Sequence, residues 1–330
     1  MSVLKDFFED LESRKIEFVN YHFDNLTVDK DFFNRDLYRF LKRDRRIVEN
    51  KIREENYDLI FAHAPTDILI LKNFLERAST IFYSNIPPYV RIFPFKFIIK
   101  KYLERLNCVI CVSEFIKRNV ENIIPSKKNV YIVYNGIEPV SSRSDPPDSI
   151  KNIGVVARLE REKNVALAIR TFKVLNRKYD YLSLHLFGDG SEKKKLEKLA
   201  LRYGMKNVYF HGFVKDIDGI YSTIDLLVVP SRMEAFSLVI IEAMSKNIPV
   251  VASNVGGIPE IIKDGYNGLL AEPNVKSFVI QITKIIENPE LINTFTKNYV
   301  QTLEKFNINK KFEDLYKIFF DQTWVMEGFK

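Results

Sequence analysis

Residues 230–260 read PSRMEAFSLVIIEAMSKNIPVVASNVGGIPE. The apolar run before them, DLLVV, predicts a buried strand that stops at Pro230. A loop follows that carries Glu234, and the pattern from about Ser237 to Asn247 predicts a helix that carries Glu242. Strand, loop and helix in this order form the repeating unit of doubly wound α/β sheets.

The same alternation continues on both sides of this stretch. Strands rich in Val, Ile and Leu, each followed by a helix, predict parallel sheets covered on both faces. The strand candidates after the central break are NIGVVARL (152–159), LSLHLFGDG (182–190), VYFHGFV (208–214), DLLVVPS (225–231), PVVASNV (249–255) and NGLLAEP (267–273). Those before it are IEFVNYHF (16–23), DLIFAHA (58–64), STIFYSN (79–85), CVICVSE (108–114) and VYIVYNG (130–136).

One break in composition divides the chain. Residues 138–149, EPVSSRSDPPDS, cannot hold a helix or a central strand. We therefore expect a Rossmann-like domain at 1–140, a linker at 141–150, a second Rossmann-like domain at 151–305 and a C-terminal helix at 306–330 that packs back on the first domain. From Val275 onward the pattern is helical throughout. Two such domains face a cleft, and ligands of such sheets bind beyond the carboxyl ends of the strands.

The bulk properties narrow the class of protein. The chain has 330 residues, of which 46% are hydrophobic and 28% are charged, and no window has the eighteen or so apolar residues of a membrane span. The N-terminus, MSVLKDFFEDLESRK, lacks the apolar segment of a secretory signal, so a cytoplasmic location is expected. Cys108 and Cys111 lie in an apolar run without a second pair, which favours buried strand cysteines over a zinc or redox site.

The predicted helix start near Phe236, Ser237 and Leu238 offers free backbone N–H groups, which suit an anion such as a diphosphate. Glu234 beside it could accept hydrogen bonds from sugar hydroxyls, and Glu242 could bind a ribose diol. The alternative is that both glutamates are surface charges. Glu242 argues against that alternative, because it lies in the apolar run LVIIEAM, where an unpaired carboxylate is costly.

Three further strand ends carry candidate residues. Arg158 ends one strand and Lys163 follows as a helix begins; they could neutralise a departing diphosphate or be two solvated charges. Gly188 and Gly190 begin a dinucleotide fingerprint, but Lys193 replaces its third glycine, so a tight turn is favoured. The HGFV segment with Phe213 could lie against a nucleotide base or simply end a strand.

Together these segments resemble the family 4 glycosyltransferases (glycosyl transferases group 1) of GT-B fold. The resemblance covers residues 151–277, and its most specific elements are the E-x7-E pair Glu234 and Glu242 and the R-L-x-x-x-K element Arg158 and Lys163. It implies that Glu234 contacts the donor sugar, that Glu242 holds the ribose, and that Arg158 and Lys163 stabilise the leaving group. It also implies backbone contacts from Ala235, Phe236, Ser237 and Leu238, a base near Phe213, and a place for Gly188 among the donor-binding residues.

The resemblance further implies a reaction. Family members retain the anomeric configuration through a front-face mechanism, usually without a metal, so we expect no cofactor and no metal ligands. The donor substrate is expected to be a nucleotide-sugar, a UDP- or GDP-sugar, and the acceptor a glycan or a lipid-linked acceptor. The main rival is a catalytically silent member that binds sugar or a partner subunit. A second rival is another GT-B activity such as a nucleotide-sugar epimerase, which the E-x7-E pair disfavours.

The N-terminal half resembles the family more loosely. IFYSNIPPYVR is similar to a Y-x-H-x-P-P segment, with Asn85 in place of the histidine and Pro87 after it. His63 ends another strand and either faces the acceptor side or is structural. The chain opens with the helix-like FFEDLESRK, so the family's first strand and glycine-rich loop are predicted to be absent. The chain is then naturally short, its recorded start is late, or a partner subunit or second copy completes the domain.

Residues 89–106, YVRIFPFKFIIKKYLERL, mix aromatic, aliphatic and cationic side chains. Such a segment can lie on an anionic membrane surface, which would make the protein peripheral on the inner face of the cell membrane. The alternative is a core helix with a solvated basic face. Nucleic acid fits only the net charge of +7, so no nucleic-acid partner is expected.

Overall fold

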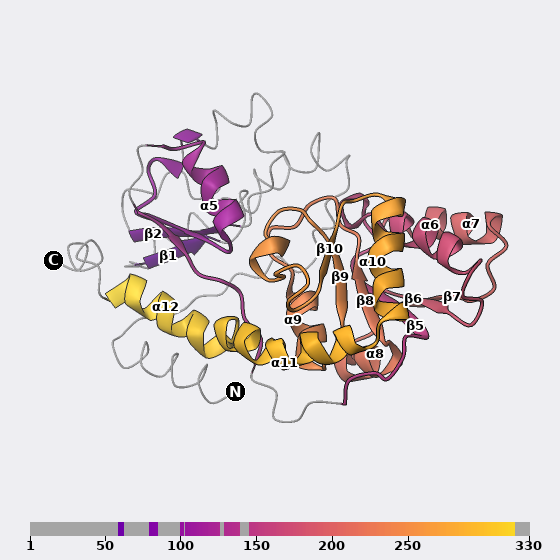
Figure 1. The fold of residues 1–330 in the computed structure, drawn as a ribbon. Coiled ribbons are helices and arrows are strands. Elements are labelled where there is room, and N and C mark those ends of the chain that lie inside the picture. The colour runs from indigo at the N-terminus through magenta and orange to yellow at the C-terminus, as the bar shows by residue number, and fades with distance from the viewer. Residues whose placement is uncertain are drawn as a thin grey trace. The chain divides into compact units, whose positions relative to one another are not determined.

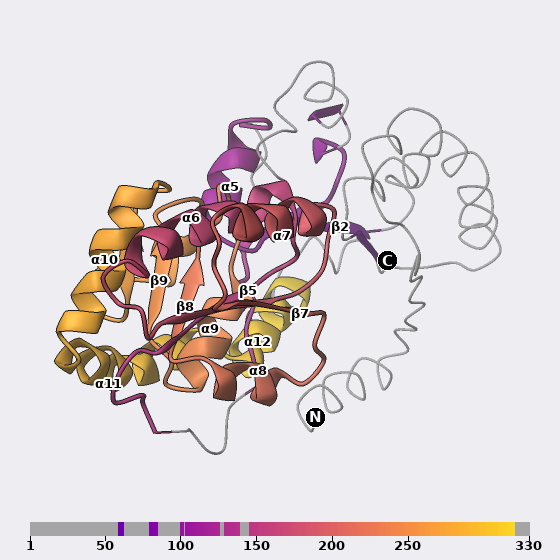
Figure 2. The same ribbon diagram turned by 90° about the vertical axis from the view of Figure 1, so that its right-hand side faces the viewer.

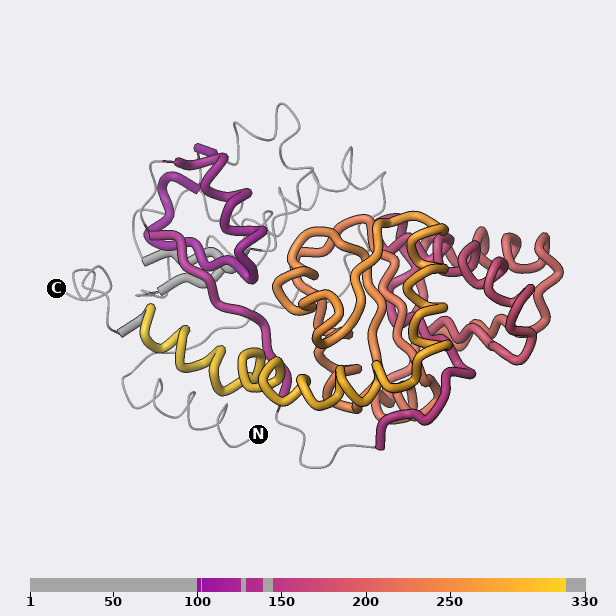
Figure 3. The backbone as a smooth tube through the Cα atoms, viewed as in Figure 1, coloured from indigo at the N-terminus to yellow at the C-terminus, as the bar shows by residue number. Residues whose placement is uncertain are grey.

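The computed structural model describes residues 59–62, 79–84, 100–101, 103–125, 129–138 and 145–320. The chain forms two compact units, one of residues 1–133 with 312–330 and the other of residues 134–311 (Figure 1). Figure 3 follows the backbone through both units. The chain passes from one unit to the other between residues 133 and 134, and again within the last helix, α12 (Ile308–Phe320).

The first unit contains a parallel sheet. Its strands lie in the order β1 (Leu59–Ala62), β2 (Ser79–Ser84), β3 (Cys108–Cys111) and β4 (Val130–Ile132). Helix α5 (Glu114–Glu121) connects β3 to β4, and its first turn is capped by the Ser113 hydroxyl, which accepts from the Ile116 N–H at 3.2 Å. Cys108 and Cys111 are free thiols with no exposed surface, as predicted, and burial raises the pKa of Cys111.

The second unit contains a six-stranded parallel sheet. The strands lie in the order β10 (Leu269–Ala271), β9 (Val250–Ser253), β8 (Leu226–Val229), β5 (Asn152–Val156), β6 (Ser183–Phe187) and β7 (Val208–Gly212). Every residue of the neighbouring strands β8 and β9 is buried, because helices cover both faces. All six strands were predicted from the alternating pattern and are confirmed.

Two layers of helices enclose this sheet (Figures 1 and 2). One layer holds α6 (Val165–Leu175), α7 (Lys193–Arg202) and α10 (Val275–Glu287), which pack on one another. The other holds α8 (Ile217–Thr223), α9 (Leu238–Ser245) and α11 (Glu290–Lys305). Short 3-10 turns, η3 (Arg161–Lys163) and η4 (Ile258–Glu260), follow β5 and β9. The core is mainly apolar, with Phe172, Phe278 and Phe295 among its largest fully buried side chains.

The predicted helical C-terminus is observed as α10, α11 and α12. No helix within the described ranges is long and apolar enough to cross a membrane. The predicted strand at 16–23, the predicted absence of a preceding strand, and most of the segment at 89–106 lie outside the described residues.

Candidate functional site

Glu234 lies in the loop between β8 and α9 with only 7% of its surface exposed. Its Oε1 accepts hydrogen bonds from the Lys163 ammonium at 2.7 Å and from the Ser231 hydroxyl at 2.8 Å. The other carboxylate oxygen, Oε2, has no hydrogen-bond partner within the described part of the chain. The loop therefore presents a buried, oriented carboxylate with one oxygen available to a ligand.

Gly256, just after β9, fixes the backbone of the Glu234 loop. Its φ of +60° is left-handed, and a Cβ at this position would lie 2.0 Å from the Glu234 carbonyl oxygen. The next residue, Gly257, donates its N–H to that oxygen at 3.0 Å. The Gly-Gly pair thus allows a close approach between two loops at the carboxyl edge of the sheet.

Lys163 reaches Glu234 because two loops are tied together. The Arg232 N–H donates to the Glu162 carbonyl at 2.8 Å, and the Asn164 amide donates to the Pro230 carbonyl at 3.2 Å. Asn164 holds the left-handed φ of 50° between η3 and α6, a conformation that asparagine tolerates better than most residues. These bonds place Lys163, whose side chain is 22% exposed, beside the carboxylate.

Arg158 follows β5 but is not part of this ion pair. Its guanidinium is 74% exposed and pairs with Glu162 at 3.3 Å. No hydrogen bond or ion pair joins it to Glu234 within the described ranges. Of the two predicted cations, the structure brings only Lys163 into contact with Glu234.

Helix α9 begins beside the carboxylate. The N–H groups of Phe236, Ser237 and Leu238 have no acceptor among the described residues, and Ser237 at the N-cap makes no side-chain cap. The ring of Phe236 packs against Tyr134 and Phe306, with centroids 6.0 Å and 5.4 Å away. Ala235 and Phe236 are half-buried, Ser237 is buried and Leu238 is exposed. The first turn is therefore anchored while its donors stay unpaired, which suits an anion.

Glu242 lies one turn further along α9 and is half-buried. Burial raises the pKa of its carboxyl group above the ordinary value of 4.5, and a hydrogen bond from the Tyr221 hydroxyl at 2.9 Å partly lowers it. The Tyr221 oxygen also lies 3.1 Å from the Val239 carbonyl, and burial raises the pKa of this phenol. The tyrosine hydroxyl therefore lies within hydrogen-bond distance of both Glu242 and the helix backbone.

Gly188 forms a tight turn after β6. Its φ is +126°, and a Cβ there would lie 1.9 Å from the Ala157 carbonyl oxygen. Lys193, at the missing third glycine, pairs with Asp189 at 2.8 Å. Phe213 follows β7 with 72% of its surface exposed, so its ring is open to a ligand.

The predicted acceptor-side residues His63, Asn85 and Pro87 lie outside the described residues. Sequence reasoning missed four residues that shape the site: Ser231, Tyr221, Asn164 and Gly256. The sequence signals for these four residues are weak. A serine three residues before a glutamate is common, and only the Gly-Gly pair after a strand suggests a close backbone approach. Within the described residues, no group of three or more His, Cys, Asp or Glu side chains is placed to hold a metal ion.

Comparison with known proteins places this geometry in a family. The family model described as Glycosyl transferases group 1 matches residues 138–301, and the model described as Glycosyltransferase Family 4 matches residues 9–140. An uncharacterized glycosyltransferase of Methanocaldococcus jannaschii is 30% identical over 287 residues, which cover 83% of this chain and 78% of that protein.

Two further proteins are similar. The lipopolysaccharide 1,2-N-acetylglucosaminetransferase of Salmonella typhimurium is 29% identical over 240 residues, covering 65% of this chain and 63% of that protein. The crystal structure of Anabaena HepE in complex with UDP-glucose superposes with a TM-score of 0.74 at 20% identity, covering 96% of this chain and 89% of that one. The likeness to HepE concerns the fold alone.

Proposed function

Because this chain belongs to the glycosyl transferases group 1, the family 4 glycosyltransferases of GT-B fold, we propose that it moves a hexose from a UDP-sugar to a glycan or lipid-linked acceptor with retention of configuration. The observation that carries this proposal is the Lys163–Glu234 contact beside the unpaired N–H groups that begin α9. The contact supplies a cation and a carboxylate to the sugar end of the nucleotide-sugar. The helix supplies N–H groups that can bind its phosphates.

The donor fits this arrangement by its chemistry. The free Oε2 of Glu234 accepts from hydroxyls of the sugar, while the ammonium of Lys163, which has three donors, also reaches the diphosphate. The N–H groups of Ser237 and Leu238 bind phosphate oxygens, and Glu242 accepts from the ribose hydroxyls. The exposed Phe213 ring lies against the base, and the Gly188 turn lets the backbone approach the donor.

The chain's own groups support a front-face reaction. The bond between the sugar C1 and the diphosphate oxygen breaks, and its electron pair stays on the diphosphate. The acceptor oxygen bonds to C1 on the same face, and its hydroxyl proton passes to the departing diphosphate oxygen. Lys163 and the α9 N–H groups stabilise the charge that develops on that oxygen, and Arg158 joins them if its exposed side chain turns inward.

Neutralisation by Lys163 and a helix N-terminus supports a reaction that needs no metal and no cofactor, because these groups supply positive potential that a divalent cation would otherwise provide. A UDP-sugar is favoured by the fold shared with HepE, whose structure holds UDP-glucose. A membrane-linked acceptor is favoured by the Salmonella relative, whose name includes lipopolysaccharide. The protein would then work at the inner face of the cell membrane.

The test is donor turnover followed by proton NMR of the released sugar. We expect slow hydrolysis of UDP-glucose or a related UDP-hexose, with the α anomer formed first and with no loss of rate in EDTA. Glu234→Gln should lower the rate about 100-fold, as removal of one oriented transition-state contact does in other enzymes. Glu290→Gln, an exposed carboxylate on α11, is the matched control and should leave the rate unchanged.

A first-formed β anomer would contradict retention. Tight UDP binding without turnover of any UDP-, GDP- or ADP-sugar would instead support the catalytically silent member of the family. An equal loss of rate in the Glu290→Gln control would contradict a specific role of Glu234 in donor turnover.

A further inference from the structure

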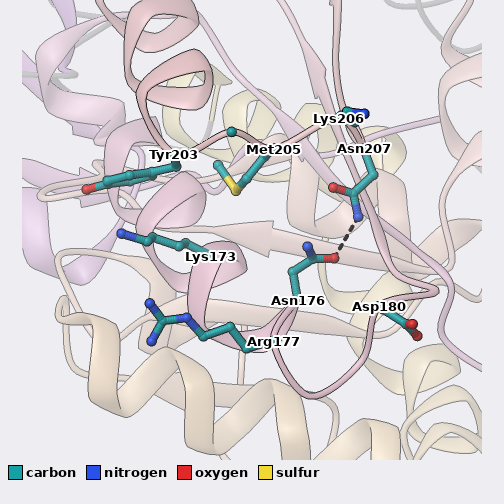
Figure 4. Close-up of a pocket in the computed structure, with 9 residues that line it drawn as sticks. Lys173, Asn176, Arg177, Asp180, Tyr203, Met205, Lys206 and Asn207 are labelled. Atoms are coloured by element: carbon teal, nitrogen blue, oxygen red, sulfur yellow. Dashed lines mark hydrogen bonds between the residues drawn. The ribbon is translucent and has the colours of Figure 1, made fainter.

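A pocket of about 510 Å³ lies in the 134–311 unit, away from the donor site (Figure 4). We call it the basic pocket. Its walls include Lys173, Asn176, Arg177, Tyr203, Lys206 and Asn207. These residues come from the C-terminal end of α6 and from the turn between α7 and β7.

The basic pocket and the donor site lie at opposite edges of the same sheet. Asn207 directly precedes β7, whereas Phe213 follows it, and the strands are parallel. Strand β6 has five residues, which at about 3.3 Å each separates its two ends by roughly 16 Å. A ligand in the basic pocket therefore cannot be the sugar or the diphosphate held by Glu234 and α9.

Positive charge dominates the pocket. Lys173, Arg177 and Lys206 form no ion pair with any described residue, and Asp180 is the pocket's single acidic residue. The Lys173 ammonium lies 3.8 Å from the centroid of the Tyr203 ring, which holds the cation in place without neutralising it. The Asp180 carboxylate and the carbonyl ends of α6 and α7, of about half a charge each, offset part of this charge, and the lining keeps a net positive charge.

The floor of the pocket is a pair of side-chain amides in fixed orientation. The Asn207 amide nitrogen donates to Asn176 Oδ1 at 2.7 Å and also donates to the Leu182 carbonyl (Figure 4). Both donors of Asn207 are thus used, while the amide nitrogen of Asn176 makes no hydrogen bond to a described residue. The pocket therefore offers one oriented neutral donor in addition to its cations.

We propose that the basic pocket binds a phosphate monoester group. A lining with three cations and one carboxylate favours an anionic ligand. The planar guanidinium of Arg177 can bind two phosphate oxygens at once, and the Asn176 amide can donate to a third. The phosphate can belong to a soluble sugar phosphate or to a lipid headgroup, and the site is independent of the donor chemistry proposed above.

Calorimetric titration of the full chain with glucose 6-phosphate, in low salt and with saturating UDP present, tests the soluble source. Flotation with vesicles that contain phosphatidic acid tests the lipid source. The pocket variant is Lys173→Ala/Arg177→Ala/Lys206→Ala. The matched control, Lys276→Ala/Lys284→Ala/Lys297→Ala, removes three exposed cations from α10 and α11 and changes the net charge equally.

We expect binding of glucose 6-phosphate but not glucose, or flotation with the vesicles, and a loss of affinity of roughly ten-fold or more in the pocket variant alone. The UDP affinity of both variants should match wild type. If the pocket variant fails to fold, Lys206→Glu, an exposed position, should show the same loss. The absence of both kinds of binding, or an equal loss in the control, would overturn the proposal.

Discussion

At the scale of single residues, the Lys163–Glu234 pair is the feature on which the site depends. Glu234 is nearly buried, and its Oε1 has two partners, of which only Lys163 is charged. Removal of that cation leaves a buried carboxylate with one neutral hydrogen bond, and such a group is costly.

We therefore predict that Lys163→Ala lowers the free energy of unfolding by about 1–3 kcal/mol, measured by urea denaturation. Lys163→Ala/Glu234→Ala should recover part of the loss, because the unpaired carboxylate is gone. The control is Lys178→Ala, whose ion pair with Glu287 lies on the surface, and it should change stability little. Equal losses in the two lysine variants would mean that the Glu234 loop is solvated.

Glu242 shows a conflict between stability and binding. Its pKa is raised above 4.5 chiefly by burial, so the folded chain holds this proton more tightly than the unfolded chain. The free energy of unfolding should accordingly fall as the pH rises from 4.5 through the raised pKa, and then level off. Glu242→Gln should remove this fall, so the variant should be more stable than wild type at pH 7.

The same variant should bind UDP about ten-fold more weakly, because it lacks the charged acceptor for the ribose hydroxyls. Thermal melts between pH 4 and 8, with and without UDP, measure both effects. Tyr221→Phe is the control: it removes the hydrogen bond that lowers the Glu242 pKa, so it should extend the pH-dependent fall to higher pH. Identical pH profiles for wild type and Glu242→Gln would refute the buried-carboxylate interpretation.

At the scale of elements, the loop after β9 positions the loop after β8. Gly256→Ala would force its Cβ against the Glu234 carbonyl, so we predict that it displaces Glu234 and lowers UDP-sugar affinity at least ten-fold. Gly265→Ala is a matched control. Gly265 also has a positive φ, of +73°, but a Cβ there would meet nothing within 4 Å.

The control should cost about 1 kcal/mol of stability from backbone strain and leave the affinity unchanged. Isothermal titration and thermal melts of both variants make the comparison. Equal affinities would show that the Glu234 loop adapts freely and that the Gly-Gly contact has no part in donor binding.

The elements themselves were largely predictable from the sequence. Each described strand falls inside its predicted run, because parallel strands buried on both faces need continuous apolar residues that stand out between helices. The helix expected from Ser237 to Asn247 is α9 (Leu238–Ser245). The positions of Glu234 and Glu242 relative to that helix follow from local spacing alone.

Contacts within the site were less predictable. Lys163 and Glu234 are 71 residues apart, and their pairing depends on hydrogen bonds between two loops that no periodicity reveals. Arg158 shows the limit of motif reasoning: it has the expected position after β5, yet its side chain pairs with Glu162 instead. The Tyr221 contact to Glu242 depends on how α8 packs beside α9, which the sequence does not specify.

At the scale of the whole molecule, every described residue of the donor site and of the basic pocket belongs to the 134–311 unit. That unit has its own core and a complete six-stranded sheet. Donor recognition can therefore be measured separately from acceptor chemistry, whose predicted residues His63, Asn85 and Pro87 lie outside the described residues.

The most direct test of the central claim is a thermal-shift titration of wild type and Gly256→Ala with UDP-, GDP- and ADP-sugars. A ligand that binds only the folded state stabilises it by about 2.7 kcal/mol at 100 times its dissociation constant. We predict that a UDP-sugar raises the melting temperature of wild type in proportion to the logarithm of its concentration, and that the same concentration stabilises Gly256→Ala by about half as much or less. No stabilisation by any of the three nucleotide-sugars, or equal stabilisation of both proteins, would contradict the account.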